Sequence, residues 1–241
     1  MSKQDEAKKR AGRRAIDEFV VDGMKLGLGS GTTSHFFVRA LGAKVRGGLN
    51  ITAATTSIAT TAVARQAGIA VTDLNDIGEL DLTVDGPDEI DRRFRMIKGG
   101  GACLLWEKIV AAASRKMITI CDESKIVESL GRFPLPVEVV PFGWRQTRRA
   151  MLRKLEEHAI EAPEVEIRKA GAAPVVTDSG HFILDCRCGK IPDPEKLEME
   201  LNTLPGVVEN GLFTRQSDGM VVGRFDGTSY VSLRERESPP G

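Results

Sequence analysis

The sequence is organised by one recurring order of elements: a short apolar run, a loop rich in glycine or hydroxyl residues, and then a helical pattern. Five apolar runs predict strands, and they end at Leu26, Ala54, Val71, Val84 and Cys121. Strands that alternate with helices predict an α/β fold with a doubly wound, Rossmann-like, mostly parallel sheet. Ligands bind beyond the carboxyl ends of the strands in such sheets. We therefore expect one functional edge, formed by the loops at Gly29, Thr55, Asp85 and Asp122.

The chain is expected to divide into two domains. The stretch Gly131-Arg-Phe-Pro-Leu-Pro136 interrupts the alternation and predicts a crossing into a second unit. From there the patterns approximate the β-α-β-β-α-β order of a smaller α+β, ferredoxin-like domain, with its exit at Leu204-Pro-Gly206. Hairpins at Asp218-Gly219 and Asp226-Gly227 are expected to rejoin the first domain. We therefore predict a catalytic domain of residues 1–130 plus 207–241, a second domain of residues 131–206, and a loose tail at Ser238-Pro-Pro-Gly241.

The overall charge gives no reason to expect a polyanionic partner. Thirty-four basic residues balance thirty-four acidic ones, so no global field favours nucleic acid or an anionic membrane surface. The amino-terminal residues lack the apolar segment of a secretory signal, and no stretch reaches the length of a transmembrane helix. We therefore expect a cytoplasmic protein that binds neither nucleic acid nor membranes, while a small anionic ligand held locally remains compatible with this balance.

The four cysteines are expected to be free thiols, as is usual in a reducing compartment. Cys186 and Cys188 lie near His181, but their spacing is not the Cys-x-x-Cys of a zinc knuckle and the run is predicted to be a strand. His35 and His158 have no neighbouring ligand set. We therefore expect no metal site.

The loop Gly27-Leu-Gly-Ser-Gly-Thr-Thr33 is a candidate anion site, because helix dipoles and free N–H groups favour negative charge where a helix begins. A dinucleotide fingerprint needs a third glycine where this chain has Thr32, and a nucleotide P-loop needs a lysine that this loop lacks. What remains is a hydroxyl-rich nest suited to a phosphate monoester, supplied by Ser30, Thr32 and Thr33 with 55–57 nearby. A tight turn in which the glycines only permit close packing is an equally good interpretation of this loop alone.

Two further segments place charge at the same edge. The acidic turn Asp85-Gly-Pro-Asp-Glu-Ile-Asp91 directly follows an apolar strand, which puts Asp85 where ligands bind, although such clusters are usually solvated turns. Lys98 is followed by three glycines and then a helix, which makes either a second anion hole beside a cation or a flexible hairpin. Two anion sites in one chain fit a substrate with a phosphate at one end and a developing oxyanion at the other.

Glu107 is the sharpest candidate for a catalytic group. Its neighbours at helical spacing are apolar or small: Cys103, Leu104, Val110 and Ala111. Desolvation on that face would raise the pKa of the carboxyl group towards the range in which it works as a general base at neutral pH. The alternative is a structural ion pair with Lys98 or an arginine.

Taken together, these motifs resemble ribose-5-phosphate isomerase of the A type, over almost the whole chain. The glycine loop is similar to that family's phosphate loop, the acidic turn to its Asp-Gly-Ala-Asp-Glu motif, and the segment from Lys98 to Lys108 to its catalytic segment. Later motifs of the family are matched by Phe133-Pro-Leu-Pro-Val-Glu-Val139, Val176-Thr-Asp-Ser-Gly180, Ile183-Leu-Asp185 and Gly211-Leu-Phe213. The resemblance implies an aldose–ketose isomerase of the non-oxidative pentose phosphate pathway, which interconverts D-ribose 5-phosphate and D-ribulose 5-phosphate through an enediolate.

The resemblance also implies roles for individual residues. Glu107 would move a proton between C1 and C2, Lys98 would stabilise the enediolate oxygen, and Asp85 would take part in ring opening or oxygen proton transfer. The substrate-binding residues would be Ser30, Gly31, Thr32, Thr33, Asp85, Gly86, Pro87, Asp88, Lys98, Gly99, Gly100, Gly101 and Lys125. We expect no metal and no organic cofactor, and a self-associating second domain would give a homodimer or homotetramer.

The chain departs from the family pattern at two positions. Pro87 stands where the family usually has alanine, which fixes one φ angle of the acidic turn. Trp106 stands where the family usually has arginine, so any ion pair made there is lost beside Glu107.

Two other functions compete with the isomerase. One is another sugar-phosphate isomerase or an amino-sugar phosphate deaminase on a similar fold, which would depend on a different catalytic set. The other is a non-catalytic sugar-phosphate sensor, which would need a DNA-reading helix-turn-helix and a basic face that the sequence does not offer.

Overall fold

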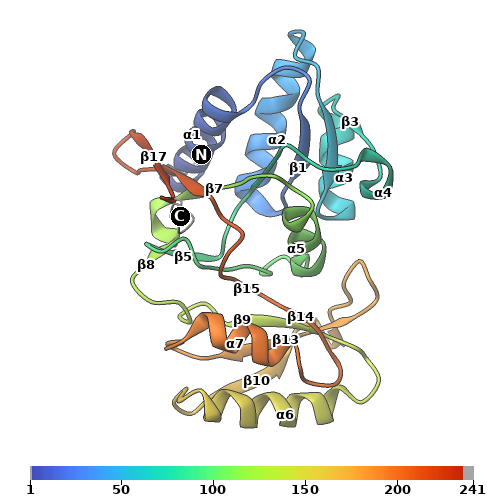
Figure 1. Cartoon of the computed structure of the whole chain (residues 1–241), viewed down its shortest axis with the longest axis vertical. Coiled ribbons are helices and arrows are strands. Elements are labelled where there is room, and N and C mark those ends of the chain that lie inside the picture. Colours follow the sequence, from blue (N-terminus) through green and yellow to red (C-terminus); the bar gives the residue numbers. More distant parts are fainter. Residues whose placement is uncertain (1, 236–241) are drawn as a thin grey trace, which may run out of the picture.

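The computed structural model describes residues 2–235, and its largest element is a seven-stranded sheet in the upper part of Figure 1. In spatial order the sheet contains β17 (Ser229–Leu233), β16 (Gly219–Gly223), β7 (Met117–Asp122), β4 (Leu82–Asp85), β1 (Lys25–Leu28), β2 (Thr52–Thr55) and β3 (Ala70–Val71). All neighbours pair in parallel except β16 and β17, which form an antiparallel hairpin. The prediction of a mostly parallel sheet is confirmed, and so is the hairpin at Asp226-Gly227. The hairpin expected at Asp218-Gly219 is wrong, because β16 begins at Gly219 and pairs with β7 and β17, not with the strand before it.

Helices cover both faces of this sheet, as a doubly wound fold requires (Figure 1). They are α1 (Lys3–Phe19), α2 (Gly31–Arg46), α3 (Ile58–Gln66), α4 (Leu74–Ile77) and α5 (Leu104–Ala112). Apolar residues of α1, α2 and α3 share one core with the central strands, and Phe37 of α2 is fully buried in it. On the other face, Val110 of α5 packs with Ile77 of α4 and Leu80. The central strands are therefore sealed, and their carboxyl ends are left as the functional edge.

The glycine loop is shorter than its sequence pattern suggests. α2 begins at Gly31, inside the segment Gly27–Thr33 that was expected to be a loop, so Thr32 and Thr33 belong to the first turn of the helix. Ser30 is the extended residue directly before the helix, with φ −105° and ψ 165°. The loop is thus a helix amino terminus placed at the end of β1, where backbone N–H groups are free to meet an anion.

A small sheet connects the main sheet to the second domain. Its four short strands are β15 (Leu212–Phe213), β6 (Met96–Ile97), β5 (Glu89–Asp91) and β8 (Ile126–Val127). β5 and β6 form an antiparallel pair that folds the acidic turn back on Lys98, which directly follows β6. The 3-10 turn Glu123–Lys125 lies between β7 and β8. This arrangement brings the acidic turn and the lysine segment to the same place.

The segment expected to be the second domain, called the second domain below, forms a four-stranded antiparallel sheet with two helices on one face (Figure 1, lower part). The strands, in spatial order, are β10 (Glu164–Ile167), β13 (Phe182–Arg187), β9 (Leu135–Val139) and β14 (Val207–Asn210), and the helices are α6 (Trp144–Glu157) and α7 (Pro194–Leu201). A short hairpin of β11 (Lys169–Ala170) and β12 (Ala173–Pro174) precedes β13. In chain order this is β-α-β-β-α-β with the spatial order of a ferredoxin-like sheet, as predicted.

The expected boundary at residue 206 needs correction. β14 pairs with β9 from Val207 to Asn210, so the second sheet continues past the Leu204-Pro-Gly206 turn before the chain leaves it. The turn is therefore the connection between α7 and β14, and the division into two domains stays a prediction. The tail expected at 238–241 lies outside the described residues.

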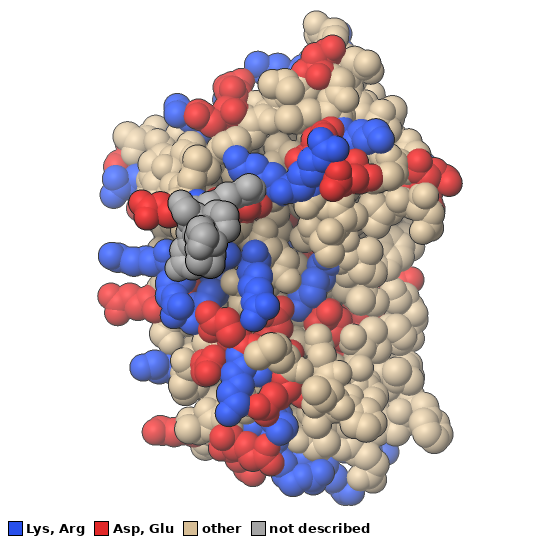
Figure 2. All heavy atoms as spheres, viewed as in Figure 1, with Lys and Arg blue, Asp and Glu red and all other residues tan. Residues whose placement is uncertain are grey.

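The described surface offers no extended area of a single charge on the face seen in Figure 2, where acidic and basic side chains lie side by side. None of the helices within residues 2–235 is both long and apolar enough to cross a membrane. Within the same residues, no group of three or more histidine, cysteine and acidic side chains is arranged to hold a metal ion.

Candidate active site

Four chain segments meet at the carboxyl edge of the main sheet and enclose one cavity of about 110 Å³. They are the start of α2, the acidic turn after β4, the segment after β6 with Glu107 on α5, and the turn before β8. The lining residues are Lys8, Ser30, Gly31, Thr32, Thr33, Gly86, Pro87, Asp88, Lys98, Gly99, Gly100, Gly101, Glu107 and Lys125. The structure therefore brings together every residue to which the family resemblance gave a role except Asp85, and residues 55–57 of the expected hydroxyl nest do not line the cavity either.

A buried cluster of one cation and two carboxylates lies at one end of the cavity. The Lys98 Nζ is 2.9 Å from Asp85 Oδ2 and 3.3 Å from Glu107 Oε1, and it donates to the Gly86 carbonyl at 2.6 Å. Asp85 and Lys98 are almost completely buried, and only 5% of Glu107 is exposed. Buried charges persist only when they are paired and hydrogen-bonded. Lys98 therefore stabilises both carboxylates, and they hold the pKa of its amine above the usual range.

Several hydrogen bonds hold the Asp85 carboxylate, and Asp85 does not line the cavity. Its Oδ1 accepts hydrogen bonds from the Ser30 amide at 3.1 Å, the Gly86 amide at 2.7 Å and the Ser34 hydroxyl at 3.1 Å. A Cβ atom at Gly29 would lie 2.0 Å from that oxygen, so only glycine fits there. Asp85 thus ties the start of α2 to Lys98, which places the two ends of the cavity at a fixed separation.

Glu107 combines burial with one free oxygen. Its Oε2 is buried and finds no hydrogen-bond partner among the described residues, whereas Oε1 faces Lys98. Burial raises the pKa of Glu107 to about 8, against the lowering effect of Lys98. A carboxylate with a pKa near neutrality is suited to take up and return a proton. The burial predicted from its apolar helical neighbours is confirmed.

The glycine segment after Lys98 lies opposite the acidic turn. The Gly100 amide donates to Asp88 Oδ2 at 2.7 Å. Gly99 has φ +109°, and a Cβ there would lie 2.8 Å from the Leu104 side chain, so the segment needs glycine at this position. Because Asp88 lines the cavity and is held by this bond, its second oxygen is available for a polar ligand.

The other end of the cavity is the amino terminus of α2, and a lysine from α1 joins it. Lys8 Nζ lies 3.1 Å from Thr32 Oγ1. The Ser30 hydroxyl is turned inward, with Thr56, Ser57 and Thr60 hydroxyls at 2.7, 2.8 and 3.0 Å. A cation, a threonine hydroxyl and free helix amides make this end suited to a phosphate group. Sequence reasoning missed Lys8, because nothing in the local pattern of α1 distinguishes it from the other basic residues there.

The two departures from the family pattern leave the cluster intact. Pro87 lines the cavity between Gly86 and Asp88 without contributing an N–H group. Trp106 is directed to the second domain, where its Nε1 donates to the Ser179 hydroxyl at 2.9 Å. Glu107 is paired with Lys98, so its burial and its charge partner do not depend on residue 106.

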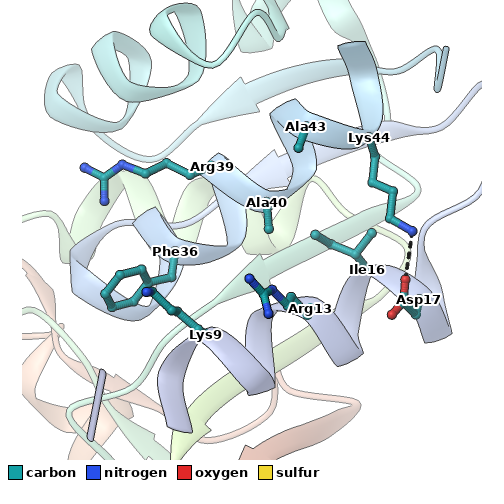
Figure 3. A pocket seen from close by; sticks show the side chains of 9 residues that line it. All are labelled: Lys9, Arg13, Ile16, Asp17, Phe36, Arg39, Ala40, Ala43 and Lys44. Atoms are coloured by element: carbon teal, nitrogen blue, oxygen red, sulfur yellow. Dashed lines mark hydrogen bonds and ion pairs between the residues drawn. The ribbon is translucent and has the colours of Figure 1, made fainter. Parts of the chain in front are cut away.

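A wider groove elsewhere lacks these features. It has a volume of about 780 Å³ and lies between α1 and α2, where Arg13 lies between the two helices and Lys44 pairs with Asp17 at 3.1 Å (Figure 3). Both members of that ion pair are more than half exposed. None of the titratable residues that line this groove is buried. The groove is therefore a solvated surface between two helices, and its larger volume does not make it a candidate active site.

The fold and this cavity define a protein of the α/β class in which a helix amino terminus suited to a phosphate group and a buried acid–base pair line one cavity. The family model for ribose 5-phosphate isomerase A, also called phosphoriboisomerase A, matches residues 52–227. The chain belongs to the ribose-5-phosphate isomerase A family.

Individual relatives match over nearly their whole lengths. Ribose-5-phosphate isomerase A 2 of Yersinia pseudotuberculosis is 64% identical, over 97% of this chain and 99% of the relative. The structure of ribose 5-phosphate isomerase from Plasmodium falciparum has 30% identity and a TM-score of 0.90, covering 96% of this chain and 100% of that one. A D-ribose-5-phosphate isomerase solved in complex with phospho-erythronic acid has 36% identity and a TM-score of 0.88, covering 97% of this chain and 100% of that one.

Proposed function

We propose that this chain interconverts D-ribose 5-phosphate and D-ribulose 5-phosphate, with Glu107 as the group that carries the proton. The observation that supports this assignment most directly is the free, buried Glu107 Oε2 beside Lys98, in a cavity that Lys8 and the start of α2 also line. The ligand of the relative solved with phospho-erythronic acid carries a phosphate and an acid group, as its name states. The two ends of this cavity match those two anionic groups.

In the proposed reaction, Glu107 removes the proton from C2 of the open-chain aldose. The electron pair of that C–H bond forms the C1–C2 double bond, and the C1 carbonyl oxygen becomes an enediolate oxygen. Lys98 stabilises the negative charge on that oxygen. Glu107 then returns its proton to C1, while the proton of the C2 hydroxyl moves to the oxygen on C1 and leaves a ketone at C2.

The two aspartates have different parts in this proposal. Asp88 lines the cavity, so it is placed to accept hydrogen bonds from the hydroxyl groups of the sugar. Asp85 is buried and paired with Lys98, so it acts on the substrate through the charge and position of that lysine. This assignment narrows the role implied for Asp85 by the family resemblance, which was direct participation in ring opening or oxygen proton transfer.

The test is turnover of D-ribose 5-phosphate by the purified protein without added metal, measured over a range of pH. We expect kcat/KM to rise with pH, because Glu107 must lose its proton to act and burial raises its pKa to about 8. Below that value, kcat/KM should fall about tenfold for each pH unit, since only the ionised fraction is active.

Two outcomes would count against the proposal. Absence of ribulose 5-phosphate with release of ammonia from an amino-sugar phosphate would favour a deaminase. A rate that stays constant from pH 8 down to about pH 5 would mean that the active base is still ionised at pH 5, so a Glu107 whose pKa is raised to about 8 could not be that base.

Lys8 provides a test of the phosphate end. We expect Lys8→Met to raise KM for ribose 5-phosphate about tenfold, because a charge-assisted hydrogen bond to an anion contributes about 1.5–3 kcal/mol. kcat should change little, since Lys98 and Glu107 are untouched. Lys3→Met removes another lysine from the exposed start of the same helix and is the matched control. An unchanged KM in Lys8→Met would place the phosphate elsewhere.

We propose further that the protein works in the cytoplasm as a homodimer or homotetramer. Its four cysteines are free thiols, which is typical of a reducing compartment. Sedimentation of the purified protein gives the number of subunits directly, and a purely monomeric species would contradict the proposed assembly.

A further inference from the structure

The second domain contacts the glycine segment 99–101 through the side chain of Arg168, which follows β10. Its guanidinium group is held by Asp185 on β13, with Nε 2.9 Å from Oδ2 and Nη2 bonded to Oδ1. The remaining nitrogen, Nη1, donates to the carbonyl oxygens of Gly99 at 2.7 Å and Gly100 at 3.0 Å. The Arg168 side chain is only 16% exposed, and its bond to Gly99 is partly buried whereas the bond to Gly100 lies at the surface.

Holding those two carbonyls fixes the direction of two amides. In a planar trans peptide the N–H points away from the C=O, so the amides of Gly100 and Gly101 are turned away from Arg168. The Gly100 amide donates to Asp88 Oδ2 at 2.7 Å. The Gly101 amide makes no hydrogen bond to another described residue, and Gly101 lines the cavity. One amide therefore holds Asp88, and the other remains a free donor in a residue of the cavity wall.

The segment has no rigidity of its own. Three successive glycines have the largest conformational freedom that a chain can have, yet close contacts require glycine here, with a Cβ at Gly100 only 2.6 Å from Asp88. A donor that acts on a developing charge must be fixed before the reaction, because reorganisation during the reaction costs rate. The charge-assisted bonds of Arg168 supply the order that the sequence of the segment cannot.

We propose that Arg168 is a positioning residue, which fixes residues 99–101 so that the Gly101 amide meets the enediolate oxygen and the Gly100 amide orients Asp88. This inference rests on the proposed isomerase function. It gives the second domain a part in catalysis within its own chain, because Arg168 and Asp185 both belong to that domain.

The test compares Arg168→Met with Arg187→Met in the full-length protein. Arg187 lies on the same sheet, is 61% exposed and has its carboxylate neighbours at 3.6 and 3.8 Å, so it is a matched control. We expect Arg168→Met to lower kcat by about 10- to 100-fold, because small misplacements of catalytic groups have effects of that size. KM should stay within about threefold, since the phosphate end is unchanged. An unchanged kcat in a folded Arg168→Met protein would overturn the proposal.

Three further measurements separate positioning from stability. Arg168→Lys keeps a charge but lacks the planar fork, so we expect it to lose most of the same kcat; full activity would contradict the proposal. Added guanidinium ion should restore part of kcat to Arg168→Ala, whereas a merely structural defect would show no rescue. If Arg168→Met does not fold, Asp185→Asn keeps the guanidinium group while loosening its anchor, and a smaller loss of kcat at similar KM is expected; no loss would again overturn the proposal.

Amide hydrogen exchange tests the inference without any assay of activity. We expect peptides covering residues 98–103 to exchange faster in Arg168→Met than in Arg187→Met, since loss of the carbonyl anchor frees the glycines. Equal exchange in the two variants would overturn the positioning role. If the wild-type protein failed to convert ribose 5-phosphate, the isomerase assignment would fail, while exchange would still decide whether Arg168 orders this segment.

Discussion

Replacement of Glu107 by glutamine is expected to lower kcat by about 10²–10⁴-fold, the range that a positioned general base contributes. Glutamine has nearly the same shape and can keep a hydrogen bond near Lys98, but it cannot accept the C2 proton. Lys98 keeps its second partner, since Asp85 remains 2.9 Å away. The substitution therefore removes the proton carrier and leaves the charge on the lysine paired.

The KM for ribose 5-phosphate should change by only a few-fold in this variant, because the phosphate end of the cavity is untouched. The increase in rate with pH should also disappear, since the group that titrates is gone. Glu156→Gln, on the exposed part of α6, is the matched control and should leave the rate unchanged. Turnover of Glu107→Gln near the wild-type rate would remove Glu107 from the mechanism.

The sequence predicted those parts of the site whose position or burial is determined by residues nearby in the chain. The strand ending at Val84 predicted where Asp85 lies, because the ends of parallel strands share one edge. Apolar residues at helical spacing predicted the burial of Glu107, because a helix has one face towards the core. In both cases the residues that determine the environment are close in the sequence.

The parts that the sequence did not predict depend on contacts between distant segments. Lys8 reaches Thr32 from another helix, and Arg168 reaches Gly99 from another domain. Neither residue has neighbours that distinguish it from an exposed basic side chain. The sequence pattern also did not predict β14, the last strand of the second sheet. The Leu204-Pro-Gly206 turn indicates that the chain changes direction, but it does not indicate whether the next strand belongs to the same sheet.

The ion cluster around Lys98 leads to the prediction with the largest effect on stability. Lys98→Met is expected to lower the free energy of unfolding by about 3–5 kcal/mol, because it leaves the buried Asp85 carboxylate without its cation and forces Glu107 to stay protonated. It should also abolish most turnover, since the charge that stabilises the enediolate oxygen is lost. Lys190→Met, at an exposed position of the second domain, is the control for loss of a lysine and should be nearly neutral.

The cost of Lys98→Met should depend on pH through Glu107. Lys98 lowers the pKa of Glu107 and burial raises it to about 8, so removal of the lysine raises that pKa further. The folded variant then keeps a proton that the unfolded chain releases above pH 4.5, the ordinary value for this group. The wild-type protein also keeps this proton below about pH 8, and above that value only the variant does. Urea titrations should therefore give a larger difference in unfolding free energy between wild type and variant at pH 9 than at pH 6. If the difference in unfolding free energy is the same at both pH values, the protonation of Glu107 does not respond to the loss of the lysine charge. Lys98 and Glu107 would then not be coupled in the way that their 3.3 Å separation indicates.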